Sequence, residues 1–547
     1  MKTQGFWKEK SNKEYLILLG IIAVLSVLYI SLCFNYNLGV DEAYSVRTFN
    51  KDWPELIKRT AGDTHPPLYY FVARTALLLF GETIPKFKLV PAAFGVLSLL
   101  LSAVYIRPRF GFRTAVGYCL FFFGIPYLTE YVIQIRMYSP VLFFVTWSAL
   151  AAVEVFHKRD LKHWIILFIA ALCACYTHNY GLLAAFVVYM ELGVMIVLHP
   201  SVQEDKQNIK NGENECGNND EKIQKVENNQ TQTRKYNRFI NRDTITWFIS
   251  GVSLIVCFFP WMLILVHQME NMPEHFMAQP VSGPLILEVL TDLFASGAEY
   301  TTYMFWFLFL VAIICCKWNL VKRFFARKRQ QKKDTQEKNE VLDNDTSALC
   351  MFGVFFFTLA LGIMLSLLIT PLLMTRYMVS CLGVFSIFMA YGLQKLPKIT
   401  FCLPGKTTGE VHQTDNKTYK LDPMIFVVVF LIGTGLQSYA TNYNTQYLQY
   451  KTNDTVAFFQ ENLSENDVVV YNEPNTRWVY ECYFDNDQLI FLSDMDFSKE
   501  YNTIWFMDSC CEPWLSDDVL TQNGLTKTYV GAYGIEYNDF SLYKITK

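Results

Sequence analysis

Polar residues suited to acid–base and phosphate chemistry stand where long apolar stretches of this chain begin or end. Adjacent carboxylates, Asp41 and Glu42, follow the first apolar stretch, and His65 precedes two prolines in the same polar segment. Other such residues lie at later boundaries: Glu130, Gln134, Arg136, Tyr138, His178, Asn179, Arg376 and Tyr377. Ionisable groups at the edge of a membrane are costly unless something uses them, so this pattern indicates a functional site.

These residue types support attack by a hydroxyl on a centre that bears a phosphate leaving group. A hydroxyl has a high pKa and must lose its proton as it attacks, so a carboxylate within hydrogen-bond reach can act as the base. A leaving phosphate gathers negative charge, which arginine can stabilise through two parallel hydrogen bonds. We therefore predict two catalytic residues, Asp41 and Glu42, and six substrate-binding residues: His65, Glu130, Arg136, Tyr138, His178 and Arg376.

Several of these residues also have a purely structural interpretation. Asp41 is a good helix N-cap, a role that is compatible with acting as a base. His65 could simply precede a helix whose first turn contains proline, and Arg136 could extend its charged end towards lipid headgroups. For Glu42 the structural interpretation is as strong as the functional one, and for His178, on a tight turn, it is the stronger of the two.

The elements that must position these residues are membrane-spanning helices. Of the 547 residues, 52% are hydrophobic, the mean hydropathy is +0.18, and the apolar runs are separated by short charged loops. This pattern is typical of a multi-span membrane protein. The formal net charge is −3 and no basic stripe is present, so we predict no nucleic-acid partner.

The orientation of the spans follows from the basic residues, which favour the cytoplasmic side of short loops. Lysines at positions 2, 8, 10 and 13 precede the first apolar run, Tyr15–Phe34, which we interpret as an uncleaved span with the N-terminus in the cytoplasm. Following the later runs gives about eleven spans in residues 1–439, with the C-terminus outside. The expected location is the plasma (inner) membrane, with the predicted site on the extracytoplasmic face.

Two segments of this region are not expected to cross the membrane. The apolar run Pro66–Phe80 has about 15 residues and would extend roughly 22 Å as a helix, short of the ~30 Å hydrocarbon core. We expect it to be an interfacial helix within a first outer loop at residues 35–85. Residues 200–243 are rich in Asn, Gln, Lys and Glu, which predicts a disordered cytoplasmic linker.

The last part of the chain, residues 440–547, changes character. Short apolar runs alternate there with polar stretches, which predicts a small extracytoplasmic α/β domain. The candidate strands are Asp467–Asn472, Gln488–Leu492, Thr503–Asp508 and Phe540–Ile545. The predicted fold class is therefore an α-helical polytopic membrane protein with a small α/β domain at its C-terminus.

Five motifs occur in a fixed order and on one predicted side of the membrane. They are the Asp-Glu pair at 41–42, HPPLYY from residue 65, RMYSP from residue 136, THNYG from residue 177 and TRY from residue 375. Over roughly residues 15–395, this combination resembles the GT-C membrane glycosyltransferases. The resemblance is strongest to bacterial relatives of protein O-mannosyltransferases and of lipid A aminoarabinose transferases.

The resemblance implies a polyprenyl-phosphate sugar donor, an acceptor hydroxyl on an extracytoplasmic glycan, lipid or protein, and transfer with inversion. It places the catalytic base on Asp41, His65 near the donor, and Arg136 on the lipid phosphate. Because arginine and histidine can hold an organic monophosphate, no cofactor is predicted, and a divalent metal is left open. No Cys/His cluster has the spacing of a zinc site.

A second interpretation is a multi-span transporter or lipid flippase without transferase activity. Such proteins place charged groups near the bilayer midplane, often in broken helices of two repeated halves. In this chain the predicted spans carry few charges and the polar residues gather at one face. This distribution favours chemistry at the membrane surface over transit through it.

Overall fold

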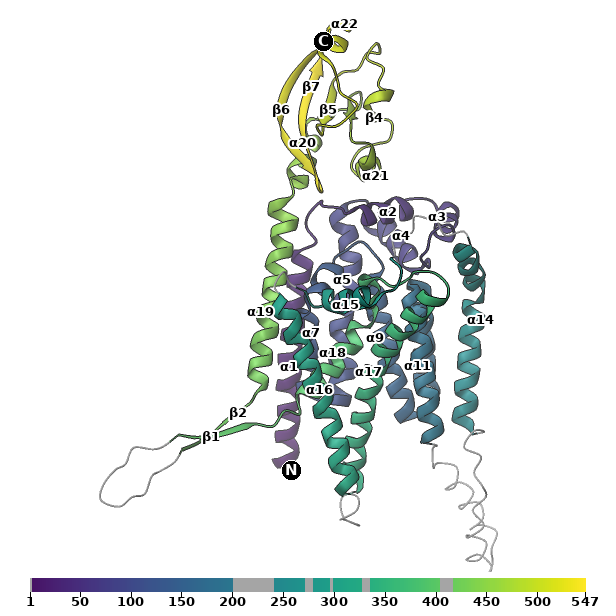
Figure 1. The fold of residues 1–547 in the computed structure, drawn as a ribbon, viewed down its shortest axis with the longest axis vertical. Coiled ribbons are helices and arrows are strands. Elements are labelled where there is room, and N and C mark those ends of the chain that lie inside the picture. The colour runs from purple at the N-terminus through teal and green to yellow at the C-terminus, as the bar shows by residue number, and fades with distance from the viewer. Residues whose placement is uncertain (1, 200–240, 271–278, 296–298, 327–334, 404–416) are drawn as a thin grey trace, which may run out of the picture.

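The computed structural model describes residues 2–199, 241–270, 279–295, 299–326, 335–403 and 417–547. It shows a bundle of long helices with a small domain at one end, which we call the domain end (Figure 1). The predicted helical membrane fold with a C-terminal α/β domain is thereby confirmed.

Nine helical stretches of the described residues are long and apolar enough to cross a membrane. Several combine more than one element, because α5 (Ile84–Leu101) continues through η1 (Ser102–Ile106) and α6 (Arg107–Phe110), and η3 (Thr375–Cys381) continues into α18 (Leu382–Leu393). The others contain α1 (Lys2–Ser31), α9 (Tyr138–Lys158), α11 (Asn179–Leu198), α14 (Arg242–Glu270), α16 (Glu299–Ala326), α17 (Thr335–Leu368) and α19 (Met424–Tyr443).

Two shorter apolar helices, α7 (Phe112–Gly124) and α10 (Leu161–Thr177), coincide with the two remaining predicted spans. The segment predicted to be interfacial contains α4 (Leu68–Phe80), which has 13 residues. At 1.5 Å per residue α4 is about 20 Å long, which is short for a bilayer crossing. The predicted linker at 200–243 lies outside the described residues up to 240, and its last two residues begin α14.

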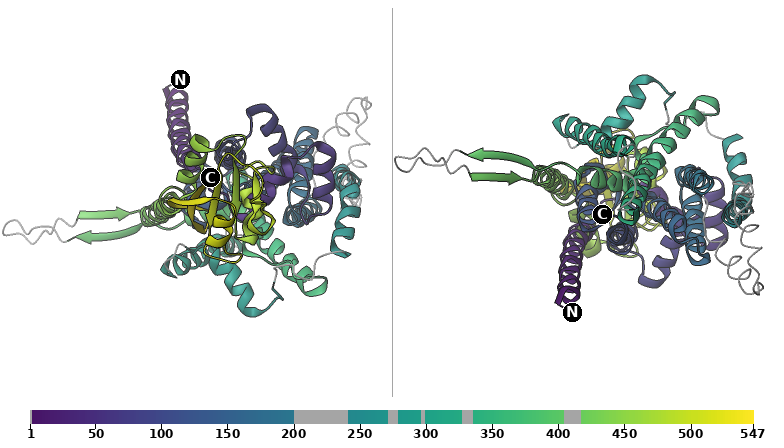
Figure 2. Two further views of the ribbon diagram at one scale, coloured as in Figure 1. Left: turned by 90° about the horizontal axis from the view of Figure 1, so that it is seen from above. Right: turned by 90° about the horizontal axis from the view of Figure 1, so that it is seen from below.

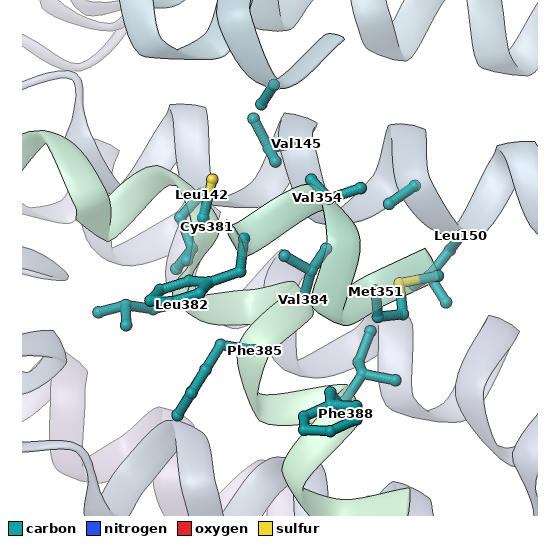
Figure 3. Close-up of a cluster of buried hydrophobic side chains, with 14 of the residues drawn as sticks. Leu142, Val145, Leu150, Met351, Val354, Cys381, Leu382, Val384, Phe385 and Phe388 are labelled. Atoms are coloured by element: carbon teal, nitrogen blue, oxygen red, sulfur yellow. The ribbon is translucent and has the colours of Figure 1, made fainter. Parts of the chain in front are cut away.

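The core of the bundle forms where α9, α17 and α18 pack together. Figure 3 shows Val145 of α9, Val354 of α17 and Phe385 of α18 among the buried apolar side chains of this cluster. A Cβ atom at Gly383 would overlap the hydroxyl of Thr146, so glycine at this position allows α18 to approach α9 closely. This packing fixes η3, which leads into α18, against the start of α9.

Short helices cover the domain end of the bundle. They include α2 (Val40–Phe49) and α3 (Trp53–Ala61), with α4 beside α2, whereas α15 (Gly283–Asp292) lies further into the bundle (Figure 1). The short helix α8 (Pro126–Tyr131) precedes the turn into α9. Their starts follow local rules. Asp52 caps α3 by accepting a hydrogen bond from the Glu55 N–H, with a proline in the first turn, and Ser282 caps α15 in the same way.

The C-terminal domain is built on a five-stranded mixed sheet in the order β4-β3-β5-β7-β6. The strands are β3 (Val468–Tyr471), β4 (Leu489–Phe491), β5 (Ile504–Asp508), β6 (Thr526–Ile535) and β7 (Asn538–Thr546), and the domain's helical elements are α20 (Thr452–Asn462), η5 (Pro474–Thr476), α21 (Arg477–Tyr480), η6 (Leu492–Asp494) and α22 (Asp517–Gln522). Strand β3 pairs in parallel with β4 and β5, while β7 is antiparallel to β5 and β6. Four of the strands were predicted. Strand β6 was missed, because glycines at 531 and 534 interrupt its apolar residues and most of the strand is not buried.

The C-terminal domain packs directly onto helix α2 and shares a hydrophobic cluster with it, in which Ala43 and Phe49 of α2 lie with Tyr480 and Phe484. Arg47 of α2 forms an ion pair of 2.8 Å with Glu481. The connection to the bundle is continuous, because α19 runs through η4 (Asn444–Gln449) towards α20. At the other end of the bundle, the hairpin of β1 (Ile399–Leu403) and β2 (Lys417–Leu421) projects sideways (Figures 1 and 2).

Candidate active site

Asp41 lies in the first turn of α2 at the domain end of the bundle. Its Oδ2 atom is 2.9 Å from Nη1 of Arg376, which is in η3. The Asp41 side chain is 46% exposed, so a substrate could reach the carboxylate. This ion pair connects residues from the ends of two different apolar stretches, which the sequence predicts to lie on the same face of the membrane.

Arg136 is the buried second cation of this cluster. Its Nη1 donates to the backbone oxygen of Asp41 at 3.1 Å and to Oγ of Ser45 at 3.1 Å. The side chain is 5% exposed, and it comes from the turn between α8 and α9. In the described part of the chain, the Nε atoms of Arg136 and Arg376 have no hydrogen-bond partner. Both guanidinium groups therefore retain donors that an anion could use.

Glu42 connects the same turn of α2 to the loop that carries Arg136. Its Oε2 accepts from the N–H of Gly39 at 2.9 Å, and its Oε1 accepts from the N–H of Ile135 at 2.7 Å. The first contact is the reciprocal half of a helix-capping arrangement, and the second crosses to the α8–α9 turn. Glu42 thereby holds Asp41 and Arg136 in a fixed relation.

His65 and His178 lie together near this cluster, with ring centroids 5.4 Å apart. The Nδ1 atom of His65 is 3.0 Å from the Thr64 hydroxyl and 3.4 Å from Oδ2 of Asp63, so two groups orient its ring. Burial alone would raise the pKa of Asp63, but the hydrogen bond and charge of His65 outweigh it and the net shift is downward. Asn179 ties the His65 loop to α11 by donating to the Thr64 backbone oxygen at 2.9 Å.

His178 is buried at the N-cap of α11. Its Nδ1 accepts from the N–H of Tyr180 at 3.0 Å, which leaves the proton of a neutral ring on Nε2. That Nε2 atom has no hydrogen-bond partner among the described residues. Burial lowers the pKa of His178 well below its ordinary value, and His65 and the two arginines lower it further. His178 is therefore a neutral donor that also caps a helix.

An apolar cavity of about 150 Å³ opens beside the two histidines. The ring of Tyr377 stands edge-on to His178, with centroids 4.8 Å apart, and Tyr138 lies on another side of His178 at 6.0 Å. The cavity is lined by His65, His178, Tyr377 and aliphatic side chains of α11, α14 and the end of α17, including Leu182, Leu183, Leu265 and Leu365. The lining of the cavity thus combines histidine and tyrosine side chains with an aliphatic wall.

A second cavity, of about 260 Å³, lies where α2 begins and is polar. Glu42, Glu130 and Gln134 line it, together with Lys88 of α5 and Glu536 of the C-terminal domain. Lys88 is 1% exposed, and its Nζ donates to Asn35 at 2.6 Å and to Gln446 at 3.1 Å. Glu130 therefore lines a different cavity from His65 and His178.

In the part of the chain that the structure describes, no three His, Cys, Asp or Glu residues come together in a way that could hold a metal ion. The cations at the site are arginine side chains, and the nearest histidine pair is flanked by aromatic rings.

The sequence model of the dolichyl-phosphate-mannose-protein mannosyltransferase family matches residues 64–202. This segment holds His65, Glu130, Arg136, Tyr138 and His178. The apo crystal structure of ArnT from Cupriavidus metallidurans superposes with a TM-score of 0.51 at 12% identity, covering 97% of this chain and 98% of that chain. Over nearly its whole length the chain therefore shares the fold of ArnT, and residues 64–202 match the mannosyltransferase family model.

ArnT from the same organism bound to undecaprenyl phosphate gives a TM-score of 0.48 at 12% identity, covering 96% of this chain and 97% of that chain. Among curated proteins, none matches the chain by sequence. At this identity the structural likeness shows the fold, so the roles of the residues are argued from the geometry of this chain.

The structure brings most of the predicted site residues to one end of the bundle. Asp41, Arg136 and Arg376 form one cluster, while His65, Tyr138 and His178 form another around Tyr377. Sequence reasoning missed Asp63, Lys88 and Glu536. A lysine within an apolar run is itself a signal for function, and it could have identified Lys88.

Proposed function

We propose that this protein is a membrane glycosyltransferase of the GT-C type. It would transfer a sugar from a polyprenyl-phosphate donor to a hydroxyl of an extracytoplasmic acceptor, with inversion at the anomeric carbon. The observation that carries the proposal is the contact between the Asp41 carboxylate and Arg376, with Arg136 on the Asp41 backbone oxygen. A base and two phosphate-binding cations meet at one point. The description of the family whose model matches residues 64–202 names a dolichyl-phosphate sugar, which supports this class of donor.

The donor phosphate would bind between Arg136 and Arg376. The Nε donors of both arginines lack partners in the described chain, and a phosphate can accept from more than one N–H of each guanidinium. His65 and His178 stand beside this position and could add N–H donors. The apolar cavity next to them suits the first isoprene units of the lipid, because its wall is aliphatic.

Binding of the phosphate also prepares the base. In the free protein Arg376 pairs with Asp41, and an incoming phosphate competes for the same guanidinium. The Asp41 carboxylate is then available to an acceptor hydroxyl. As the acceptor oxygen bonds to the anomeric carbon, the bond from that carbon to the phosphate oxygen breaks, Asp41 takes the hydroxyl proton, and polyprenyl phosphate leaves with its charge on the arginines.

The proposed topology puts this site outside the cytoplasm. The basic residues at the N-terminus and the tract KRFFARKRQQKK at 322–333 lie in segments predicted to be cytoplasmic. The domain end of the bundle would then face outward, and the protein would reside in the plasma (inner) membrane. There the donor lipid and a water-exposed acceptor can both reach Asp41.

The proposal is tested by incubating the purified full-length protein with polyprenyl-phosphate sugars that carry a label in the sugar. Membranes from cells that lack the protein serve as the source of acceptor. We expect release of unlabelled polyprenyl phosphate and label in acceptor material. A transporter or flippase would instead move the intact donor across proteoliposome membranes without cleaving it. Intact donor after prolonged incubation with every sugar tested would contradict the proposal.

A further inference from the structure

The polar cavity at the start of α2 has features of a second ligand site. These features are not explained by the phosphate-binding cluster, which we define as Asp41, Arg136 and Arg376. It measures about 260 Å³ and is lined by carboxylate, amide and hydroxyl side chains from the membrane bundle and the C-terminal domain. Two buried acceptors in it are unused. Asn37 is 3% exposed, and its Oδ1 and the Oε1 of Gln134 have no hydrogen-bond partner within the described residues. A buried acceptor without a partner is costly, and a ligand hydroxyl would satisfy it.

We propose that this cavity binds a sugar ring that carries no negative charge, either the sugar of the donor or a sugar of the acceptor. The inference rests on the proposed function and names the chemistry of one of its substrates. Amides and carboxylates that line one cavity match the many hydroxyl groups of a sugar, each of which can donate and accept. The volume suits a sugar ring better than a protein segment.

The charge of the cavity disfavours anionic ligands. Three carboxyl groups, those of Glu42, Glu130 and Glu536, line it with one ammonium, that of Lys88. Glu42 already accepts from two backbone N–H groups, and Lys88 already donates to Asn35 and Gln446. A uronate or phosphate would therefore find no free cation in the cavity, and above about pH 7 it would also face the ionised carboxylate of Glu536, whose pKa is about 7.

The cavity is adjacent to the reacting groups. Glu42 follows Asp41 in the first turn of α2, and Gln134 lies two residues before Arg136, so one turn of helix and one tight loop separate the cavity from the phosphate-binding cluster. The C-terminal domain closes it through the turn between β6 and β7, which carries Glu536 and Tyr537. This contact gives the C-terminal domain a part in recognising the substrate.

Saturation-transfer NMR on the full-length protein tests the proposal, in a detergent without a sugar headgroup. The probes are glucose, N-acetylglucosamine and glucuronate. We expect saturation transfer to at least one neutral sugar and a weaker signal for glucuronate. No signal for either neutral sugar, or a glucuronate signal as strong as theirs, would overturn the proposal.

Variants locate the binding in the cavity. Asn442→Ala and Gln134→Ala each remove one lining amide, and loss of one or two hydrogen bonds should weaken neutral-sugar binding about three- to tenfold. Asn462→Ala is the matched control, because Asn442 and Asn462 each donate to the backbone oxygen four residues earlier, and only Asn442 lines the cavity. Equal signals in all three variants and the wild-type protein would place the binding elsewhere and refute the proposal.

Competition identifies which substrate supplies the sugar. Displacement of the free sugar by a sugar-linked polyprenyl phosphate but not by bare polyprenyl phosphate assigns the cavity to the donor sugar. Displacement by neither assigns it to the acceptor. Displacement by bare polyprenyl phosphate shows that the lipid phosphate occupies the cavity, contrary to the proposal. A protein that binds neutral sugars in this cavity but cleaves no donor would refute the proposed function and leave this inference standing.

Discussion

The carboxylate of Asp41 lies 2.9 Å from the guanidinium of Arg376, although 335 positions separate them in the chain. The side chains of the pair are 46% and 28% exposed, and ion pairs that reach solvent contribute only about 0–1 kcal/mol to stability. The contact is therefore better explained by the reaction than by folding. In the proposed mechanism, the contact holds the base Asp41 and the phosphate-binding Arg376 together until a donor separates them.

Replacing Arg376 should weaken binding of the lipid phosphate. Hydrogen bonds to charged groups contribute about 1.5–3 kcal/mol, so Arg376→Ala should lower the affinity for bare polyprenyl phosphate by about 10- to 100-fold. Arg376→Lys should recover part of this loss, because lysine keeps the charge but not the paired geometry. The measurement is the dissociation constant of polyprenyl phosphate for the purified protein.

Arg113→Ala is the control for that experiment. Arg113 also forms an ion pair with an aspartate, Asp422, at 3.3 Å, but Arg113 lies in the first turn of α7 and Asp422 between β2 and α19, outside the candidate site. We expect its affinity for polyprenyl phosphate to equal that of the wild-type protein. Unchanged affinity in both Arg376 variants would exclude Arg376 from the phosphate site.

Glu42→Gln should destabilise the site without removing the proposed base. The carboxylate of Glu42 accepts from two backbone N–H groups, and a glutamine side chain offers only one acceptor oxygen and would turn its NH₂ group towards the other N–H. The expected cost is about 1–3 kcal/mol, visible as a lower Tm of the purified protein. Glu55→Gln, at a half-exposed pair with Arg59, is the matched control and should leave the Tm unchanged. An E42Q protein as stable as wild type would show that the bridge between α2 and the α8–α9 turn is unimportant.

The raised pKa of Glu536 predicts that the contact between the C-terminal domain and α2 depends on pH. Burial, and then the nearby charges of Glu42 and Asp41, raise its pKa from 4.5 to about 7. The folded protein thus holds this proton more tightly than the unfolded chain, so the associated stability is present below about pH 4.5 and is lost as the pH rises towards 7. Glu536→Gln resembles the protonated form at every pH.

The difference in Tm between E536Q and the wild-type protein measures this effect. It should be near zero at pH 4.5, grow in favour of E536Q as the pH rises, and level off above pH 7. Taking the difference cancels the titration of other groups, including Glu130, whose pKa is also raised by burial and by the charge of Glu42. A Tm difference that stays constant over this range would show that Glu536 does not titrate in contact with α2.

Some features of the fold and of the candidate site can be predicted from the sequence because the membrane constrains where polar residues lie. The alternation of apolar runs, together with the basic loops, puts residues such as Asp41, Arg136 and Arg376 at one end of the bundle before any contact is known. Because few polar residues stand at these positions, the sequence alone could predict which residues form the candidate cluster. The strands β3 and β5 were predictable for a related reason, since buried central strands have continuous apolar sequences.

Other features depend on long-range contacts that leave no local pattern. The main partners of Lys88 are Asn35 and Gln446, the second of them 358 positions away, and Glu536 meets α2 only because the β6–β7 turn folds against it. The structural role of Glu42 likewise depends on the Ile135 N–H, a backbone group that every residue except proline carries. Sequence alone could not choose between its two interpretations.

The most direct test of the account compares binding and turnover in Asp41→Asn. Asparagine keeps the size of the side chain but cannot take a proton from the acceptor, and it releases Arg376 from its ion pair. Loss of a general base costs about 10²- to 10⁴-fold in rate, so we expect single-turnover transfer to fall by that factor while affinity for the donor stays equal or increases. Asp487→Asn, on an exposed loop of the C-terminal domain, should behave as wild type. A D41N protein that transfers sugar at a near-normal rate would contradict the assignment of Asp41 as the base.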